Sequence, residues 1–186
     1  MKGERILVLG CPGSGKTVFS LRLAARTSLP LHHLDDLYWK EGWGRPVPED
    51  WRAEVQALVD RPRWIIDGNF HETLDLRLAA ADMAIVLHVP RVTRLWRVAV
   101  RALRQRCGER STLPSRVQGS VGRFGTFHLQ SSFLRKVWTF DHTVMVEMEP
   151  MLRARGGTVE VMRLTGGRAA RRFLRDVEVA GGPRSS

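Results

Sequence analysis

Residues 10–17 are Gly10-Cys11-Pro12-Gly13-Ser14-Gly15-Lys16-Thr17, and they match the phosphate-binding pattern GxxxxGK[ST]. An apolar run at residues 5–9, typical of a short buried strand, precedes this stretch, and apolar residues recur at helical spacing after it. A strand, a glycine-rich turn and a helix in this order bring backbone N–H groups together at the positive end of a helix. The stretch therefore predicts a nucleotide-phosphate site, in which Lys16 bridges the β- and γ-phosphates and the Thr17 hydroxyl binds Mg²⁺.

The rest of the chain predicts an α/β fold built around this loop. Five apolar runs, typical of parallel strands, lie at about 4–9, 31–34, 63–67, 83–89 and 158–164. Helical patterns separate the first four runs, including expected helices near 49–60 and 71–80, and a further helical pattern covers about 127–155. Continuous apolar strands alternating with helices are typical of a parallel sheet covered on both faces. We expect one domain over residues 1–179, with a lid insertion at about 105–126 and a disordered tail at 180–186.

Composition agrees with a single core. The chain has 186 residues, of which 43% are apolar, enough for one substantial core. No stretch approaches the length of a membrane-spanning segment, and the first strand begins almost at Met1, so we expect a cytoplasmic protein without a signal peptide. Two cysteines, Cys11 and Cys107, form no disulfide framework and lack metal-ligand spacing. The sequence does not indicate an oligomeric state.

The net charge of +11 is unevenly distributed. Residues 1–90 contain 11 Lys/Arg and 12 Asp/Glu, whereas residues 91–186 contain 19 and 7, a surplus of +12. A nucleic-acid surface is one interpretation, and an arginine-lined lid that holds phosphates is another. A general preference for arginine is a third interpretation, because the chain has 26 arginines and four lysines.

The helix expected after the fourth strand carries part of this charge. At 100° per residue its arginines fall within about 80° of one another; they are Arg94, Arg97, Arg101 and Arg104. The opposite side is apolar, with Val92, Leu95, Trp96, Ala99 and Leu103. We therefore expect the apolar side to pack against the protein and the arginine side to be presented away from the core.

Candidate functional residues follow the strands, because ligands of open α/β sheets bind at the carboxyl ends of the strands. Asp67 ends the third strand and is the candidate Mg²⁺ ligand, with capping of the next helix as its alternative role. Asp35 follows the second strand and is the candidate group that accepts the proton of a substrate hydroxyl or binds that substrate. Asp36 competes with Asp35 for this role.

An acceptor site is expected beside these carboxylates. Arg77 is a candidate ligand for an acceptor phosphate or carboxylate, with an ion pair to a neighbouring acid as the alternative. Asn69, Tyr38 and Trp39 are further candidate acceptor residues, since aromatic rings stack on flat acceptors. Helix packing is an equally good explanation for the aromatic residues, and Trp51 is expected in the core. His32 and His33 are interpreted as structural.

These motifs resemble the adenylate-kinase-like P-loop proteins, and most closely the topology modulation proteins of the FlaR type. The similarity covers about residues 4–176 and is carried by the phosphate loop, Leu34-Asp35 with Tyr38-Trp39 and Gly42-Trp43, Trp64-Ile65-Ile66-Asp67-Gly68-Asn69, Arg77, Ala81-Asp82, Val89-Pro90-Arg91 and Phe133-Leu134 with Trp138. Two positions depart from the family pattern, because Ser131-Ser132 and His88 stand where acidic residues are common. Adenylate kinase itself is disfavoured, since Asp67-Gly68-Asn69-Phe70 replaces its Asp-Gly-Phe-Pro-Arg.

The resemblance implies a five-stranded parallel sheet in the order 2-3-1-4-5, with a helical lid. It implies ATP on the phosphate loop, adenine near the turn after the fifth strand, and Mg²⁺ held by Thr17 and Asp67. The implied nucleotide-binding residues are Gly10, Pro12, Gly13, Ser14, Gly15, Lys16, Thr17, Arg97, Arg104 and Gly166. Lys16, Asp35 and Arg101 are the candidate catalytic residues.

Two functions are consistent with this pattern. The favoured one is a kinase, similar to the nucleoside monophosphate kinases or to small-molecule kinases, that transfers the γ-phosphate of ATP to an acceptor that the sequence does not identify. The alternative is an ATP-binding regulator of the topology modulation type that associates with nucleic acid and has no small-molecule kinase activity. No nucleic-acid recognition motif is present, and the aromatic residues lie away from the basic half. A nucleotide-binding module without turnover is the remaining possibility.

Overall fold

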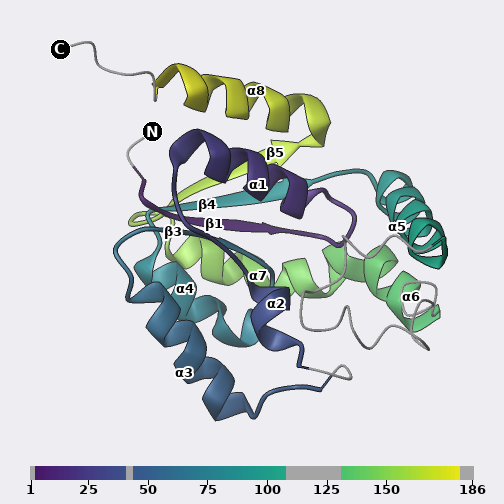
Figure 1. Cartoon of the computed structure of the whole chain (residues 1–186), viewed down its shortest axis with the longest axis horizontal. Helices are drawn as coiled ribbons and strands as arrows, with labels where there is room; N and C mark the ends of the chain where they lie inside the picture. The colour runs from purple at the N-terminus through teal and green to yellow at the C-terminus, as the bar shows by residue number, and fades with distance from the viewer. Residues whose placement is uncertain (1–2, 41–43, 108–130, 181–186) are drawn as a thin grey trace.

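The structure, a computed structural model, describes residues 3–40, 44–107 and 131–180. Its centre is a five-stranded parallel sheet in the order β2-β3-β1-β4-β5 (Figure 1). The strands are β1 (Arg5–Gly10), β2 (Leu31–His33), β3 (Trp64–Asp67), β4 (Met83–His88) and β5 (Glu160–Thr165). The predicted fold class and strand order are confirmed.

Helices cover both faces of the sheet (Figure 1). One face is covered by α1 (Lys16–Thr27) and α8 (Gly166–Ala180), and the other by α3 (Pro48–Val59), α4 (Leu74–Ala80) and α7 (Val144–Ala154). The short α2 (Leu34–Tyr38) follows β2, and α5 (Arg91–Arg106) packs against α6 (Ser131–Thr139) near the carboxyl ends of the strands. Single 3-10 turns lie at His71–Thr73 and Phe140–His142. The expected lid insertion and tail lie almost entirely outside the described residues, as do residues 127–130 of the expected helical segment.

Two apolar clusters explain why the strands are apolar without alternation. Leu7 and Leu9 of β1 belong to the cluster beneath α3, α4 and α7, whereas Ile6 and Val8 belong to the cluster beneath α1 and α8. All four side chains are fully buried, because both faces of a parallel sheet are covered. Trp51 of α3 is 3% exposed and lies in the first cluster, as predicted.

The register of the sheet brings the candidate residues together at one edge. Asp67, the last residue of β3, pairs in register with Val8 of β1 and with His33 of β2. Val8 lies two residues before the end of β1 at Gly10, and His33 is the last residue of β2. The phosphate loop therefore starts beside the ends of β2 and β3.

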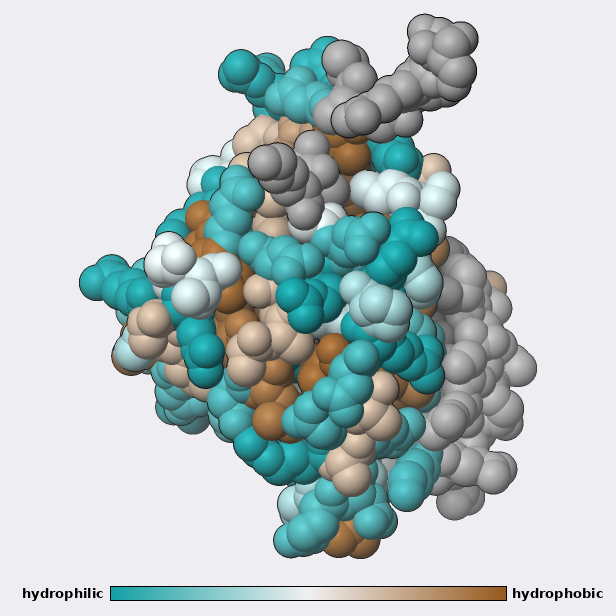
Figure 2. Space-filling model, turned by 90° about the vertical axis from the view of Figure 1, so that its left-hand side faces the viewer, coloured by the Kyte–Doolittle hydropathy of each residue, from teal (hydrophilic) through white to brown (hydrophobic). Residues whose placement is uncertain are grey.

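The opposite end of the sheet, at the amino ends of the strands, has a surface in which hydrophilic residues predominate around smaller apolar areas (Figure 2). Within the described ranges, no helix is long and apolar enough to cross a membrane.

The orientation of α5 corrects the sequence prediction. Its apolar side faces solvent, with Val92 74%, Trp96 65% and Leu103 61% exposed. Arg94, on the opposite side, is 1% exposed and donates to Asp141 Oδ1 at 3.0 Å, and its second terminal nitrogen donates to Asp141 Oδ2. The buried side also carries Val98 and Ala102, both 0% exposed, and Val98 packs with Val137 and Phe140. Apolar contacts at these residues, together with the polar partners of Arg94 and Arg97, therefore turn this side of the helix inward.

Candidate functional site

The phosphate loop connects the end of β1 to the start of α1, and all three of its glycines have positive φ. Gly10 has φ 143° and Gly13 has φ 81°, values that side-chain-bearing residues rarely adopt. A Cβ on Gly13 would lie 2.7 Å from the carbonyl oxygen of Arg94. The missing side chain at Gly13 therefore allows α5 to pack directly on the loop.

The side chain of Lys16, the first residue of α1, contacts the backbone of the phosphate loop. Its Nζ donates to the carbonyl oxygens of Gly10 at 2.7 Å and Cys11 at 3.4 Å. Cys11 is buried, and its Sγ contacts the carbonyl oxygen of Val137 at 3.7 Å, so this side chain fills space between the loop and α6. Thr17 is exposed in the first turn of α1, so its hydroxyl is accessible to a ligand. Both cysteines that the structure describes are free thiols.

Asp67 provides the buried carboxylate of the site. It is 5% exposed, and its Oδ2 lies 3.1 Å from Nδ1 of His33, whereas its Oδ1 is buried without a hydrogen-bond partner. The hydrogen bond to Asp67 is the largest cause that raises the pKa of His33 above its ordinary value. A carboxylate oxygen without a partner is costly unless a ligand binds it, so this observation fits a Mg²⁺ ligand.

Among the described residues, few side chains are placed to bind Mg²⁺ at this site. Within the described ranges, no group of three or more His, Cys, Asp or Glu side chains could hold a metal ion. Mg²⁺ commonly takes only one or two protein ligands and completes its shell with phosphate oxygens and water. Asp67 and Thr17 remain the residues predicted to hold it. The alternative role of Asp67 as a helix cap is not observed, because Phe70 is the N-cap of the following 3-10 turn and makes no side-chain cap.

Asp35 is the second residue of α2, and the residue is exposed. Desolvation by the surrounding protein is the largest influence on it and raises its pKa, while Lys16 and Arg101 act in the opposite direction. The side chain of Trp39 also hydrogen-bonds to the Asp35 carboxylate and favours its charged form. Asp35 is thus an exposed residue whose carboxyl group is under the electrostatic influence of Lys16 and Arg101, a setting that fits a group acting on a phosphoryl acceptor.

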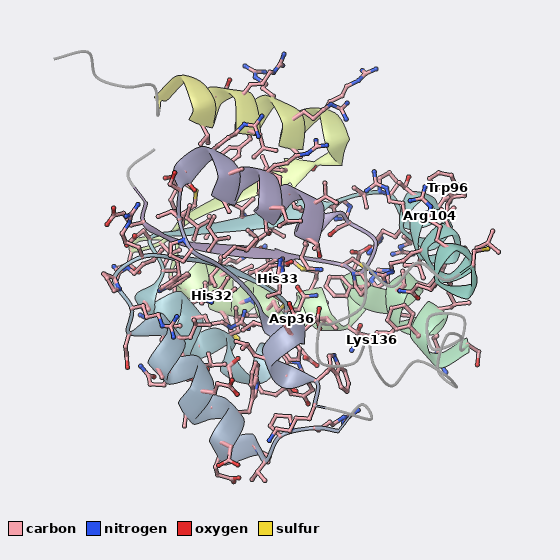
Figure 3. The ribbon with its side chains drawn as sticks, viewed as in Figure 1. His32, His33, Asp36, Trp96, Arg104 and Lys136 are labelled. Carbon is pink, nitrogen blue, oxygen red and sulfur yellow. The ribbon has the colours of Figure 1, made fainter. Side chains whose placement is uncertain are left out.

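The arginines of α5 differ in what they contact. Arg97 donates from Nη1 to the carbonyl oxygens of Gly13 at 3.3 Å and Ser14 at 3.1 Å. Arg101 is half-buried, its Nε has no partner, and desolvation lowers its pKa against the opposing effect of Asp35. Arg104 is exposed on the outer part of α5 (Figure 3). Arg97 and Arg101 therefore lie on the side of α5 that faces the site.

Arg77 is placed differently from the prediction. It is 0% exposed, and its guanidinium donates to three carbonyl oxygens of the turn after β3, namely Gly68 at 2.9 Å, Asn69 at 2.5 Å and Phe70 at 2.6 Å. Its Nε donates to Thr73 O at 3.3 Å, and burial lowers its pKa to about 9. This geometry argues against direct contact with an acceptor and makes Arg77 the internal support of the turn.

Asn69 is also occupied by the protein. Its amide nitrogen donates to Gly10 O at 2.9 Å, and its amide oxygen accepts from Gly10 N at 3.1 Å. The side chain therefore ties the turn after β3 to the first residue of the phosphate loop. Like Arg77, it has a structural position where an acceptor ligand was predicted.

Tyr38 and Trp39 remain at the end of α2, and both are half-buried. The Tyr38 ring lies 5.0 Å from Trp39, 5.1 Å from Trp51 and 4.5 Å from Phe70, measured between ring centroids. The packing explanation applies to Tyr38, whose ring contacts core residue Trp51, whereas stacking of either ring on an acceptor stays a prediction. His33, interpreted as structural, proves to be the partner of Asp67, and the adjacency of β2 and β3 is the signal that the sequence reasoning did not use.

A groove of about 290 Å³ adjoins the phosphate loop on the side of α1 and α8. Its lining includes Gly15, Phe19, Arg97, Gly166, Gly167 and Leu174. Apolar side chains and glycine backbone beside a phosphate loop can accommodate a flat base. The groove lies at the turn after β5, where adenine was expected.

Comparisons with known proteins identify the fold. No protein-family model matches the chain, and no curated protein matches it in sequence. The shikimate kinase from Acinetobacter baumannii, solved in complex with shikimate, is 16% identical and has a TM-score of 0.51, covering 92% of this chain and 89% of that chain. The shikimate kinase from Bacteroides thetaiotaomicron is 12% identical with a TM-score of 0.53, covering 96% and 98%. The chain therefore has the P-loop α/β fold of shikimate kinases.

Proposed function

We propose that this protein is an ATP-dependent phosphotransferase that transfers the γ-phosphate of ATP to a hydroxyl group of a small acceptor. The observation that carries the proposal is the meeting of three groups at the carboxyl ends of β1, β2 and β3. Lys16 lies on the phosphate loop, Asp67 has a buried oxygen without a partner, and Asp35 is an exposed residue under the electrostatic influence of Lys16. The likeness in fold to shikimate kinases supports the same reaction class.

In this proposal the donor nucleotide binds along the phosphate loop. Backbone N–H groups at the start of α1 and the ammonium group of Lys16 bind the phosphates, and the base occupies the groove beside Gly166 and Arg97. Thr17 and Asp67 would hold Mg²⁺, which would neutralise charge on the phosphates of the nucleotide. Ser14 Oγ, which is buried without a partner, is a further group that could donate a hydrogen bond to the nucleotide.

The acceptor approaches from the side of α2. Asp35 accepts the proton of the acceptor hydroxyl as its oxygen attacks the γ-phosphorus, and the bond to the bridging oxygen of ADP breaks. Arg101 lies near enough to interact with Asp35 and supplies positive charge to the transferred phosphoryl group. Positioning and charge stabilisation are sufficient for this reaction, so no covalent protein intermediate is required.

The deciding experiment is transfer of labelled γ-phosphate from ATP to a panel of hydroxyl-bearing small molecules. The proposal expects transfer to at least one acceptor and loss of that transfer in Lys16→Ala. Slow ATP hydrolysis that no acceptor accelerates across a broad panel would count against it. Binding of ATP·Mg²⁺, measured separately by calorimetry, distinguishes an inactive kinase from a chain that binds no nucleotide.

Association with nucleic acid is the second candidate function, and α8 favours it. Arg168, Arg171, Arg172 and Arg175 lie at helical spacing and are exposed, and no carboxylate in the described part of the chain pairs with them. Nitrogen-tipped side chains extend outward from α8 in Figure 3. If these four arginines contact phosphates, the slope of log affinity against log salt should be about −3 to −4 for duplex DNA. Absence of binding at low salt would exclude this function.

The narrower resemblance to the topology modulation proteins rests on sequence motifs alone. It is compatible with either candidate function, since the branch name describes an effect on DNA topology and not a reaction. The labelled-transfer and salt-titration experiments decide between the two.

A further inference from the structure

His33 and Asp67 are paired both in the sheet and through their side chains. Each is the last residue of its strand, and the parallel register of β2 and β3 pairs them directly. Leu31 and Ile65, two residues earlier on the same strands, pack in the apolar cluster beneath α1 and α8. Because side chains alternate along a strand, His33 and Asp67 lie on this same face of the sheet, which α1 covers and where its first turn carries Thr17.

The hydrogen bond between the two side chains has a defined direction. An ionised carboxylate only accepts hydrogen bonds, so Nδ1 of His33 carries the proton and donates to Oδ2 of Asp67, at 3.1 Å. Both the cationic imidazole and one of its neutral tautomers have this proton. His33 is the N-cap residue of α2 and makes no side-chain cap there, so its ring serves the carboxylate and not the end of the helix.

The two oxygens of Asp67 differ in their surroundings. The side chain is 6% exposed, and Oδ2 has His33 as its partner. Oδ1 is buried and has no hydrogen-bond partner. A pair that only stabilised the fold would be expected to leave neither oxygen in this state, because a buried oxygen without a partner costs free energy. The asymmetry indicates that Oδ1 is the oxygen available to a ligand.

Rotation of the carboxylate would remove this asymmetry. The last torsion of an aspartate side chain is broad and roughly two-fold, so a carboxylate without a partner samples many orientations. The hydrogen bond from His33 restricts that torsion, and the strand register fixes the spacing of the two backbones. Hydrogen bonds of this kind orient carboxylates that bind metals, and their loss typically lowers metal affinity about 10- to 100-fold.

We propose that His33 is a positioning residue of the metal site: its Nδ1–H holds Oδ2 of Asp67, so that Oδ1 is the oxygen that would bind Mg²⁺. This inference rests on the nucleotide and Mg²⁺ site of the proposed function. It gives His33, interpreted from the sequence as structural, a part in metal binding that acts through Asp67 and not through contact with either substrate.

The test measures metal binding without turnover. Mn²⁺ replaces Mg²⁺ as the probe, and its affinity for the complex of the full chain with ADP is obtained from the electron paramagnetic resonance signal of free Mn²⁺. His33→Leu removes the donor and should weaken Mn²⁺ binding at least about tenfold. His33→Asn places an amide nitrogen near the position of Nδ1 and should keep the affinity within about threefold of the wild type. ADP affinity in the presence of a chelator should change less than about twofold in both variants, because the loop binds phosphates through other groups.

His32→Leu is the matched control on the same strand. His32 pairs in register with Ile66 and lies on the opposite face of the sheet, so its loss should change Mn²⁺ affinity less than about twofold. Asp67→Asn removes the charged ligand itself and should weaken Mn²⁺ binding more than His33→Leu does. Unfolding curves establish that each variant is folded.

The wild-type protein without metal provides a measurement that needs no variant. Nitrogen-15 spectra of the imidazole side chains should show a proton on Nδ1 of His33. A proton on Nε2 alone would overturn the inference, because Nδ1 could then not donate to Asp67.

The possible failures are distinguishable. Wild-type Mn²⁺ affinity in His33→Leu, or the same loss in His33→Asn as in His33→Leu, would overturn the inference and leave the phosphotransferase function intact. An equal loss of ADP affinity without metal would overturn it as well, since His33 would then support the whole site. If Asp67→Asn binds Mn²⁺ like the wild type, or if the wild type binds neither ADP nor Mn²⁺, the site of the proposed function fails, and the inference fails with it.

Discussion

The two sides of the candidate site use opposite chemistry. The donor side, made of the phosphate loop, α1 and α5, presents backbone N–H groups and the cations Lys16, Arg97 and Arg101. The acceptor side, made of α2 and residues 67–77, presents carboxylates and aromatic rings, while its own buried cation, Arg77, donates to backbone carbonyl oxygens. The two sides therefore offer different groups to the two substrates of the proposed reaction.

The two sides also differ in how they are supported. On the donor side, α5 packs closely on the loop, because a Cβ on Gly13 would lie 2.7 Å from Arg94 O, and Arg97 donates to the carbonyl oxygens of Gly13 and Ser14. On the acceptor side, side chains give the support, because Arg77 donates to the turn after β3 and Asn69 ties that turn to Gly10. Asn69 and Arg77, which the sequence suggested as ligand-binding residues, therefore support the backbone of the site.

The largest effect is expected from removing the donor-side cation. Lys16→Ala should lower phosphoryl transfer about 10³-fold, or about 4 kcal/mol, because a preorganised charge on the transferring group is lost. Lys136→Ala, at an exposed lysine of α6, is the matched control and should change transfer less than twofold. Steady-state kinetics at saturating ATP measure both. Comparable rates in the two variants would show that Lys16 does not act on the phosphates.

The next effect concerns stability on the acceptor side. Arg77→Met should lower the free energy of unfolding by about 3 kcal/mol, since several buried carbonyl oxygens lose their donor. Arg52→Met removes an exposed arginine that pairs with Asp75, and should cost less than about 1 kcal/mol. Urea denaturation of both variants tests the difference. A stable Arg77→Met variant with a raised KM for the acceptor alone would restore the role of Arg77 as an acceptor ligand.

Removing the acceptor-side carboxylate should affect transfer and spare nucleotide binding. Asp35→Asn should lower kcat about 10²-fold, or about 2.7 kcal/mol, as expected for loss of a general base. ATP affinity, measured by calorimetry, should change less than about threefold. Asp36→Asn is the matched control with a smaller loss in kcat. A larger loss in Asp36→Asn would exchange the roles of the two carboxylates.

The smallest effect lies far from both sides, at the amino ends of β1 and β4. Asp82 accepts hydrogen bonds from the backbone N–H groups of Glu4 and Arg5 and pairs with the Arg5 guanidinium at 2.7 Å. Against the opposing effect of desolvation, these donors hold the pKa of Asp82 below the ordinary value of 3.8. Asp82→Asn should cost about 1 kcal/mol at neutral pH, with no change in transfer, because the pair is partly exposed.

The pH dependence of this contribution has a defined sign. Because the folded-state pKa is lowered, the stabilisation is fully present above the unfolded value of 3.8 and is lost as pH falls through the folded value. Urea denaturation of the wild type and Asp82→Asn at several pH values should show their difference shrinking in that acid range. A difference that stays constant would mean that the carboxylate charge contributes nothing.

Part of the site was predictable because it is encoded locally. Residues 10–17 predict their own conformation and ligand class, and the apolar run before Asp67 places that carboxylate at a strand end. The roles of Asn69 and Arg77 were not predictable in this way. Asn69 reaches Gly10 across 59 residues, and Arg77 satisfies carbonyl groups whose orientation depends on the turn after β3.

Local patterns in the chain were thus enough for the phosphate loop and the five strands, since strand periodicity reflects burial on both faces of the sheet. The order of the strands was predicted from the family resemblance and not from local patterns. Only the folded chain revealed which side of α5 is buried. The orientation depended on Asp141, 47 residues from Arg94, on the loop carbonyls that bind Arg97, and on the apolar cluster that Val98 forms with Val137 and Phe140. Which side of such a helix is buried depends on the residues that it contacts, and these come from distant parts of the sequence.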